Sequence, residues 1–198
     1  MESTTLFPKH GGFRKLRSFQ TAQIIYDGTV IFCDRFIDKR SRTHDQMVQA
    51  ARSGVQNIAE GSLASATSKR TELKLTGVAR ASLGELLLDL EDFLRQRMLR
   101  QWKKDDPEAI AVRSKYKEGK AGMPDPSDRS DGSDKPGKKA FHFTGLDAEE
   151  SANTLICLVN QTSCLLWAQM KTLEKEFLAQ GGFTERMYQS RKNSRTQP

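Results

Sequence analysis

The sequence has few of the residues from which catalytic, metal and redox sites are usually built. It contains three histidines and three cysteines among 198 residues. No histidine lies three residues after a glutamate, the spacing that di-metal sites in helical proteins use. The cysteines Cys33, Cys157 and Cys164 form no Cys-x-x-Cys pair, and no Ser/His/Asp or Cys/His set has a suitable context. We therefore predict no metal, no other cofactor and no enzyme activity.

Long apolar runs are also absent, and we expect no secretory leader. A membrane-spanning helix needs about 20 consecutive apolar residues, and the apolar runs here are only a few residues long. The segment Met1–Thr5 lacks the basic and apolar regions of a signal peptide. An odd number of cysteines without a signal is typical of the reducing cytoplasm. We expect a cytoplasmic protein with no membrane segment.

Basic residues are in excess. Lys and Arg number 32 against 25 Asp and Glu, which gives a net charge of +7 and a pI near 9.4. This balance is compatible with an anionic partner such as RNA or DNA. Many basic proteins bind no anionic partner, so this alternative stays open.

Apolar residues recur at spacings of three and four, which is typical of amphipathic helices. Plausible N-caps are Thr43, Ser68 and Asp147, and Gly61 is expected to close the second helix in a left-handed conformation. No period-two strand pattern occurs. The chain is therefore predicted to be all-α: an antiparallel up-down four-helix bundle in a single domain, residues 1–198. The expected helices span about 15–40, 43–60, 69–102 and 147–180.

A long polar insertion is predicted between the third and fourth helices, over residues 103–146. Pro107 begins a short helix that reaches about Lys117, and Gly119 to Lys139 contains almost nothing apolar. Residues 132–139 nearly match a phosphate-binding P-loop, but Lys139 replaces the Ser or Thr that holds magnesium, and no βαβ unit is present. We interpret this segment as a linker. Residues 184–198 form a basic C-terminal tail.

Two stretches carry a resemblance to a known family. Asn57-Ile58-Ala59-Glu60-Gly61 is followed by Ala79-Arg80-Ala81-Ser82-Leu83-Gly84-Glu85-Leu86. Together they resemble the bacterial four-helix bundle proteins linked to intervening sequences of 23S ribosomal RNA genes, in the longer subgroup with a C-terminal suffix. The resemblance implies a four-helix bundle that forms homo-oligomers, often pentamers. A related protein, the accessory variability protein of diversity-generating retroelements, binds a reverse transcriptase and nucleic acid through basic surfaces.

The polar residues of these stretches have two interpretations. They form a ligand or partner site, or they fix the hairpin of the second and third helices through an ion pair between Glu60 and Arg80. We favour the structural role and expect Glu60→Ala to lower stability. The residues assigned to this structural motif are Asn57, Glu60, Gly61, Arg80, Ser82 and Glu85.

Basic residues beside the motif are the candidate phosphate contacts. We predict a non-enzymatic oligomer that binds RNA or DNA without reading sequence, as an accessory factor, with a reverse transcriptase or another nucleoprotein as possible partner. The alternative is a protein-interaction scaffold whose apolar helix faces bind another protein. The preferred contacts are Arg52, Lys69, Arg70 and Lys74, and those of the tail are Arg186, Arg191 and Lys192.

Overall fold

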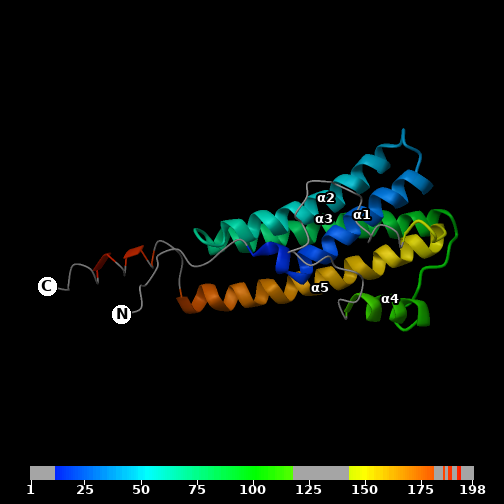
Figure 1. Ribbon diagram of the computed structural model, residues 1–198. Coiled ribbons are helices and arrows are strands. Elements are labelled where there is room, and N and C mark those ends of the chain that lie inside the picture. Colours follow the sequence, from blue (N-terminus) through cyan, green and yellow to red (C-terminus); the bar gives the residue numbers. More distant parts are fainter. Residues whose placement is uncertain (1–11, 118–142, 181–184, 186, 189–190, 193–198) are drawn as a thin grey trace, which may run out of the picture.

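The protein is all-helical throughout the part that the computed structural model describes, which is residues 12–117, 143–180, 185, 187–188 and 191–192. No strand occurs within these ranges, which confirms the predicted all-α class (Figure 1). A short 3-10 turn, Phe13–Lys15, precedes the first α-helix. Within the described ranges the labelled helices are α1 (Arg17–Phe36), α2 (Arg42–Ala64), α3 (Lys69–Gln96), α4 (Pro107–Lys117) and α5 (Ala148–Gln180).

Side-chain caps fix where three of these helices begin. The Ser68 hydroxyl accepts a hydrogen bond from the Thr71 N–H at 3.1 Å, so this predicted N-cap of α3 is confirmed. Asp147 caps α5 through the Glu150 N–H at 2.8 Å, and the Glu150 carboxylate accepts from the Asp147 N–H in return. The cap of α2 is Ser41 rather than Thr43, whose N–H donates to the Ser41 hydroxyl.

Gly61 does not end α2, contrary to the prediction from sequence. The helix continues through this residue to Ala64. Gly61 is buried, and a Cβ there would lie 3.4 Å from both the Glu72 carbonyl oxygen and the Leu75 Cβ of α3. The absence of a side chain at Gly61 therefore permits α2 and α3 to approach closely. It does not serve to end the helix, as the sequence had suggested.

Two helices end earlier than predicted. The backbone of Ile37 is extended, which stops α1 at Phe36. α3 stops at Gln96, because Met98 takes a positive φ of 53° and the Leu99 N–H bonds back to the Leu94 carbonyl at 3.0 Å. This is the Schellman arrangement, with methionine where glycine is usual. The side chain of Met98 is 95% exposed, so it adds nothing to the apolar face of α3.

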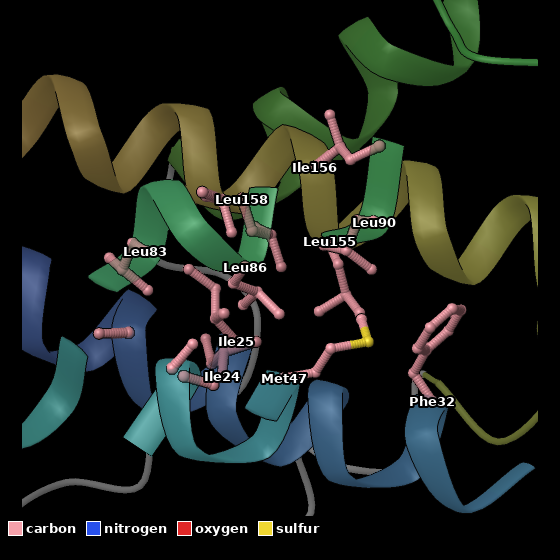
Figure 2. Close-up of a cluster of buried hydrophobic side chains, with 14 of the residues drawn as sticks. Ile24, Ile25, Phe32, Met47, Leu83, Leu86, Leu90, Leu155, Ile156 and Leu158 are labelled. Carbon is pink, nitrogen blue, oxygen red and sulfur yellow. The ribbon is translucent and has the colours of Figure 1, made fainter. Parts of the chain in front are cut away.

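One apolar core joins α1, α2, α3 and α5. Each of these four helices packs against two of the others, in the pairs α1 with α2, α2 with α3, α3 with α5, and α5 with α1. Figure 2 shows Ile25 of α1, Met47 of α2, Leu86 of α3 and Leu155 of α5 pointing into the space between these helices. Burial of such side chains from water is the main favourable contribution to folding.

The remaining helix, α4, lies outside this core. Among the described helices, its one extensive contact is with α5. The segment before α4 is attached to α5 by Asn153, which accepts from the Trp102 N–H and donates to the Arg100 carbonyl, both at 2.8 Å. Phe143, just before α5, is 1% exposed. Both flanks of the predicted insertion are therefore fixed to the core, whereas residues 118–142 lie outside the described part of the chain.

None of the helices in the described ranges is both long enough and apolar enough to cross a membrane.

Candidate nucleic-acid interface

The hairpin of α2 and α3 is held by close packing and by a short polar network. Gly54 gives room to Leu83, whose Cδ2 would lie 2.8 Å from a Cβ at that glycine. The hydroxyls of Ser53 and Ser82 are 3.1 Å apart, and the Asn57 amide donates to the Ser53 hydroxyl at 3.1 Å. Asn57 and Ser82, two of the motif residues, therefore link the helices by hydrogen bonds.

The predicted ion pair between Glu60 and Arg80 does not form. Glu60 is exposed on α2 and has no ion pair within the described part of the chain. Arg80 is directed to α5, where its guanidinium lies 5.2 Å from the centroid of the Trp167 ring. An exposed carboxylate in water needs no partner, so the reason to expect a loss of stability in Glu60→Ala is gone.

Lys69 lies between two carboxylates. Its ammonium is 3.3 Å from Glu72 Oε2 and 3.1 Å from Glu176 Oε2, and its side chain is largely buried. Burial alone would lower the pKa of Lys69, but the hydrogen bonds and charges of Glu176 and Glu72 outweigh it and raise the pKa. The pKa of Glu72 is raised by burial, against the opposing effect of Lys69. Lys69 therefore connects α3 to α5, and a phosphate would have to displace these carboxylates to reach it.

The other preferred cations are free on the surface. Arg70 and Lys74 are exposed and lie one turn apart on α3, and Arg52 is exposed on α2. None of the three has an ion pair with a carboxylate among the described residues. Their ammonium and guanidinium groups are thus available to anions. Arg52 lies further along the hairpin, at the level of the contact between its neighbour Ser53 and Ser82.

A second group of cations surrounds an exposed aromatic ring. Trp167 of α5 is 48% exposed. Arg80 from α3 and Lys171, one turn further along α5, lie 5.2 and 5.1 Å from the centroid of its ring. Both distances are within the range of cation–π attraction, about 6 Å. The Lys171 ammonium also contacts the Glu174 carboxylate at 3.4 Å, whereas Arg80 has no ion pair in the described ranges.

The predicted tail contacts are described only in part. Arg191 and Lys192 are helical and exposed. Arg186 lies outside the described residues. Arg191 and Lys192 therefore add positive charge to the surface after α5.

The far end of the hairpin has the opposite charge. A groove of about 720 Å³ between α2 and α3 is lined by Asp45, Glu85 and Asp89, with Arg42 as its one cation among the lining residues. Burial raises the pKa of Asp89, and the neighbouring Asp92 and Glu85 raise it further. Glu85 and Ser82 lie in this groove, so these motif residues belong to a surface that would repel phosphate.

The two buried thiols, Cys33 and Cys157, are poor nucleophiles. Burial, with the charges of Asp34 and Asp89, raises the pKa of Cys33 to about 12. Burial also raises the pKa of Cys157. The reactive form of cysteine is the thiolate, which such pKa values disfavour at neutral pH. Among the described residues, no group of three or more His, Cys, Asp or Glu side chains is arranged to hold a metal ion.

Comparison of the chain with models of protein families, with curated proteins and with solved structures gave no match. The resemblance to the intervening-sequence proteins therefore rests on the two motif stretches alone.

The cluster of Trp167 with the cations Arg80 and Lys171 was not predicted from the sequence. Trp167 lies one residue from Leu166 in an apolar part of α5, where the pattern of threes and fours assigns Leu166 to the core. Arg80 lies 87 positions earlier, so its proximity depends on how α3 and α5 pack. The available signal was that Trp167 lies about 100° around the helix from Leu166, outside the stripe that Leu166 and Met170 share at a spacing of four.

Proposed function

We propose that this protein is a non-enzymatic nucleic-acid-binding protein that contacts phosphates through α3 and does not read sequence. The observation that supports this proposal most is the pair Arg70 and Lys74, exposed one turn apart and free of ion pairs within the described ranges. The acidic residue between them, Glu72, is buried against Lys69. Its charge is therefore taken up inside the protein rather than beside the two cations.

The finer architecture belongs to this proposal. We infer an antiparallel up-down four-helix bundle formed by α1, α2, α3 and α5, with residues 103–146 inserted and α4 packed outside. The cyclic order of helix pairs supports it, as does the course of the chain in Figure 1. Homo-oligomerisation, a cytoplasmic location and membership of the intervening-sequence family are parts of the same proposal. Several subunits would multiply the phosphate contacts and strengthen binding by avidity.

The test is a titration of the protein with a short random-sequence DNA duplex and with an RNA of equal length. We expect affinity to fall steeply between about 50 and 200 mM salt, because each phosphate contact releases counterions. The double variant Arg70→Gln and Lys74→Gln is expected to reduce the log–log salt slope for the duplex by about 2, at roughly 0.9 per contact.

The matched control is the double variant Lys39→Gln and Arg40→Gln. It removes the same charge from the turn between α1 and α2, which Figure 1 places at the opposite end of α2 from the start of α3. We expect its salt slope to stay close to that of the parent. An absence of binding at low salt, or equal slopes for the two double variants, would contradict the proposal.

A protein-interaction scaffold is the second candidate function. It is favoured by exposed apolar side chains, of which Leu178 (77% exposed) and Leu88 (63%) are examples. Apolar docking depends little on salt, so a bound protein that stays bound as salt rises would select this candidate.

A further inference from the structure

Trp167 is a large aromatic side chain exposed on the surface of α5. Tryptophan offers the largest flat surface of any side chain, and here about half of it is in contact with solvent. The neighbouring residue Leu166, which is buried in the core shared by the helices, fixes the helix that carries it, and Leu173 is buried as well. The ring is therefore held on a rigid element with part of its surface open.

The cations around the ring distinguish this patch from an ordinary apolar one. The Arg80 guanidinium lies 5.2 Å from the ring centroid and the Lys171 ammonium 5.1 Å. The packing of α3 on α5 brings Arg80 here: Gly77, one turn earlier, faces Met170, whose terminal methyl would lie 3.7 Å from a Cβ at the glycine. A protein surface docking on Trp167 would have to bury or displace both charges, which is costly unless they find partners.

We propose that Trp167, with Arg80 and Lys171, is a stacking site for an unpaired base of single-stranded RNA or DNA. Both cations lie over the ring, so a base that stacks on the indole takes the place of one of them, and the phosphates on either side of the base can then contact the two cations. Tryptophan and arginine are the residues that single-strand-binding proteins use in this way, and the interaction tolerates any base because each has a π face. This inference rests on the proposed function and adds the kind of strand that the surface prefers.

The geometry also explains why a single strand would be preferred to a duplex. In a duplex the faces of the bases are covered by their neighbours, so an exposed ring has nothing on which to stack. The cations of α3 can continue the path of such a strand around the helix: Lys74 precedes Arg80 by six residues, which is about 9 Å along the helix axis and about a third of a turn around it. The strand would then pass from Trp167 toward Lys74 and Arg70.

The chain contains two tryptophans, so the ring can be observed directly. In the variant Trp102→Phe, Trp167 is the only tryptophan left. We expect titration with a dT oligonucleotide of about 12 residues, within the site sizes usual for single-strand binding, to quench its fluorescence. A duplex of the same length, at a concentration where it is bound, is expected to leave the fluorescence nearly unchanged. If Trp102→Phe folds poorly, the same quenching is measured in the parent and compared with Trp167→Phe.

Three substitutions separate stacking from apolar contact. Trp167→Phe keeps an aromatic face and is expected to keep most of the affinity for oligo(dT). Trp167→Leu keeps an apolar side chain without a π face, and we expect it to bind oligo(dT) about tenfold more weakly than the parent, with an unchanged salt slope. Arg80→Gln is expected to reduce the slope for the single strand by about 0.7.

The outcomes distinguish this inference from the proposed function. If Trp167→Leu binds oligo(dT) as tightly as the parent while Arg70→Gln with Lys74→Gln binds more weakly, the stacking site is wrong and the nucleic-acid function stands. If the parent binds neither strand type, both are wrong. If Trp167→Leu changes the sedimentation of the protein without nucleic acid, the ring is covered by a second copy and the stacking site is overturned.

Discussion

Residues 151–159 of α5 are all buried, whereas between residues 160 and 179 only Thr162, Leu166 and Leu173 are. The first half is covered on every side. α1 and α3 pack on one side of α5, and α4 packs against it as well, with Ala109 of α4 itself buried. Figure 2 shows Ile156 lying apart from Leu155 and Leu158, and it is buried too.

The second half of the same helix has a different structure. Its buried residues recur at the spacing of a single stripe, and the remaining face carries Trp167, Lys171 and Leu178 in contact with solvent. The comparison shows that the segments packed against α5 determine which part of this helix stays exposed and available for binding. α4 and the segment before α5 take up the outer side of the first half, which leaves the second half open for the proposed stacking site.

The largest expected effect on stability comes from truncating Phe143, a buried side chain in the segment just before α5. Phe143 is 1% exposed, and a Cβ at Gly28 of α1 would lie 2.7 Å from its ring. Phe143→Ala is therefore expected to lower the free energy of unfolding by about 3–5 kcal/mol, measured by urea denaturation. If Phe143→Ala changes stability by less than about 1 kcal/mol, this residue is not part of the core.

Gly28→Ala is the companion to that experiment. In the parent it is expected to cost about 1–3 kcal/mol, because the new methyl group collides with the Phe143 ring. In the Phe143→Ala background the collision disappears and the same change is expected to be neutral or stabilising. Equal costs in the two backgrounds would show that the two residues do not contact each other.

A direct comparison of the two halves uses one type of substitution in each. Leu158 is 0% exposed and Leu178 is 77% exposed. We expect Leu158→Ala to cost about 2–5 kcal/mol and Leu178→Ala less than about 0.5 kcal/mol, from the same denaturation experiment. A similar cost at both positions would mean that the second half is covered in solution, for instance by another subunit.

Asn153 tests how the segment before α4 is attached to the first half. Asn153→Ala removes the acceptor for the Trp102 N–H and the donor to the Arg100 carbonyl. The expected cost is about 1–2 kcal/mol, because two partly buried backbone groups lose their hydrogen-bond partner. Hydrogen exchange should speed up at Trp102 and not in α2, and an unchanged rate at Trp102 would rule out the attachment.

A small, pH-dependent effect is expected at Glu72, which is linked to the second half of α5 because Lys69 contacts both Glu72 and Glu176. Burial raises its pKa in the folded protein. A folded-state pKa above the unfolded one means that the folded protein binds more protons, so stability falls as pH rises from about 4.5 through the raised value. Glu72→Gln is expected to remove this fall. Thermal unfolding at pH 4 and 7 should show a larger gain at pH 7, of less than about 1 kcal/mol.

Much of the helical pattern could be predicted from the sequence, because spacing reports directly on which residues share a helix face. In α2, for example, the residues that recur at spacings of three and four are all buried, namely Met47, Ala51, Gly54 and Ile58. The helix ends were predicted less well. Gly61 has the right chemistry to end a helix, but its use depends on how closely α3 approaches, which a single sequence does not reveal.

The candidate site could be predicted only where it depends on local sequence. Exposure of Arg70 and Lys74 follows from their place opposite the apolar face of α3. The partners of Lys69 and Arg80 lie on α5, about a hundred positions later, and a single sequence does not show which residues of two helices meet. Phe143 illustrates the same limit, since its contact with Gly28 joins segments separated by 115 positions.

The contact between Gly28 and Phe143 also has a consequence for how related sequences are expected to vary. A glycine inside a helix costs about 1 kcal/mol relative to alanine, so position 28 is under pressure to change unless the aromatic ring is present. Chains that lose the aromatic residue at 143 are free to acquire alanine at 28, and chains that keep it are not. The two positions are therefore expected to change together during evolution, although neither belongs to the motif stretches by which the family resemblance is recognised.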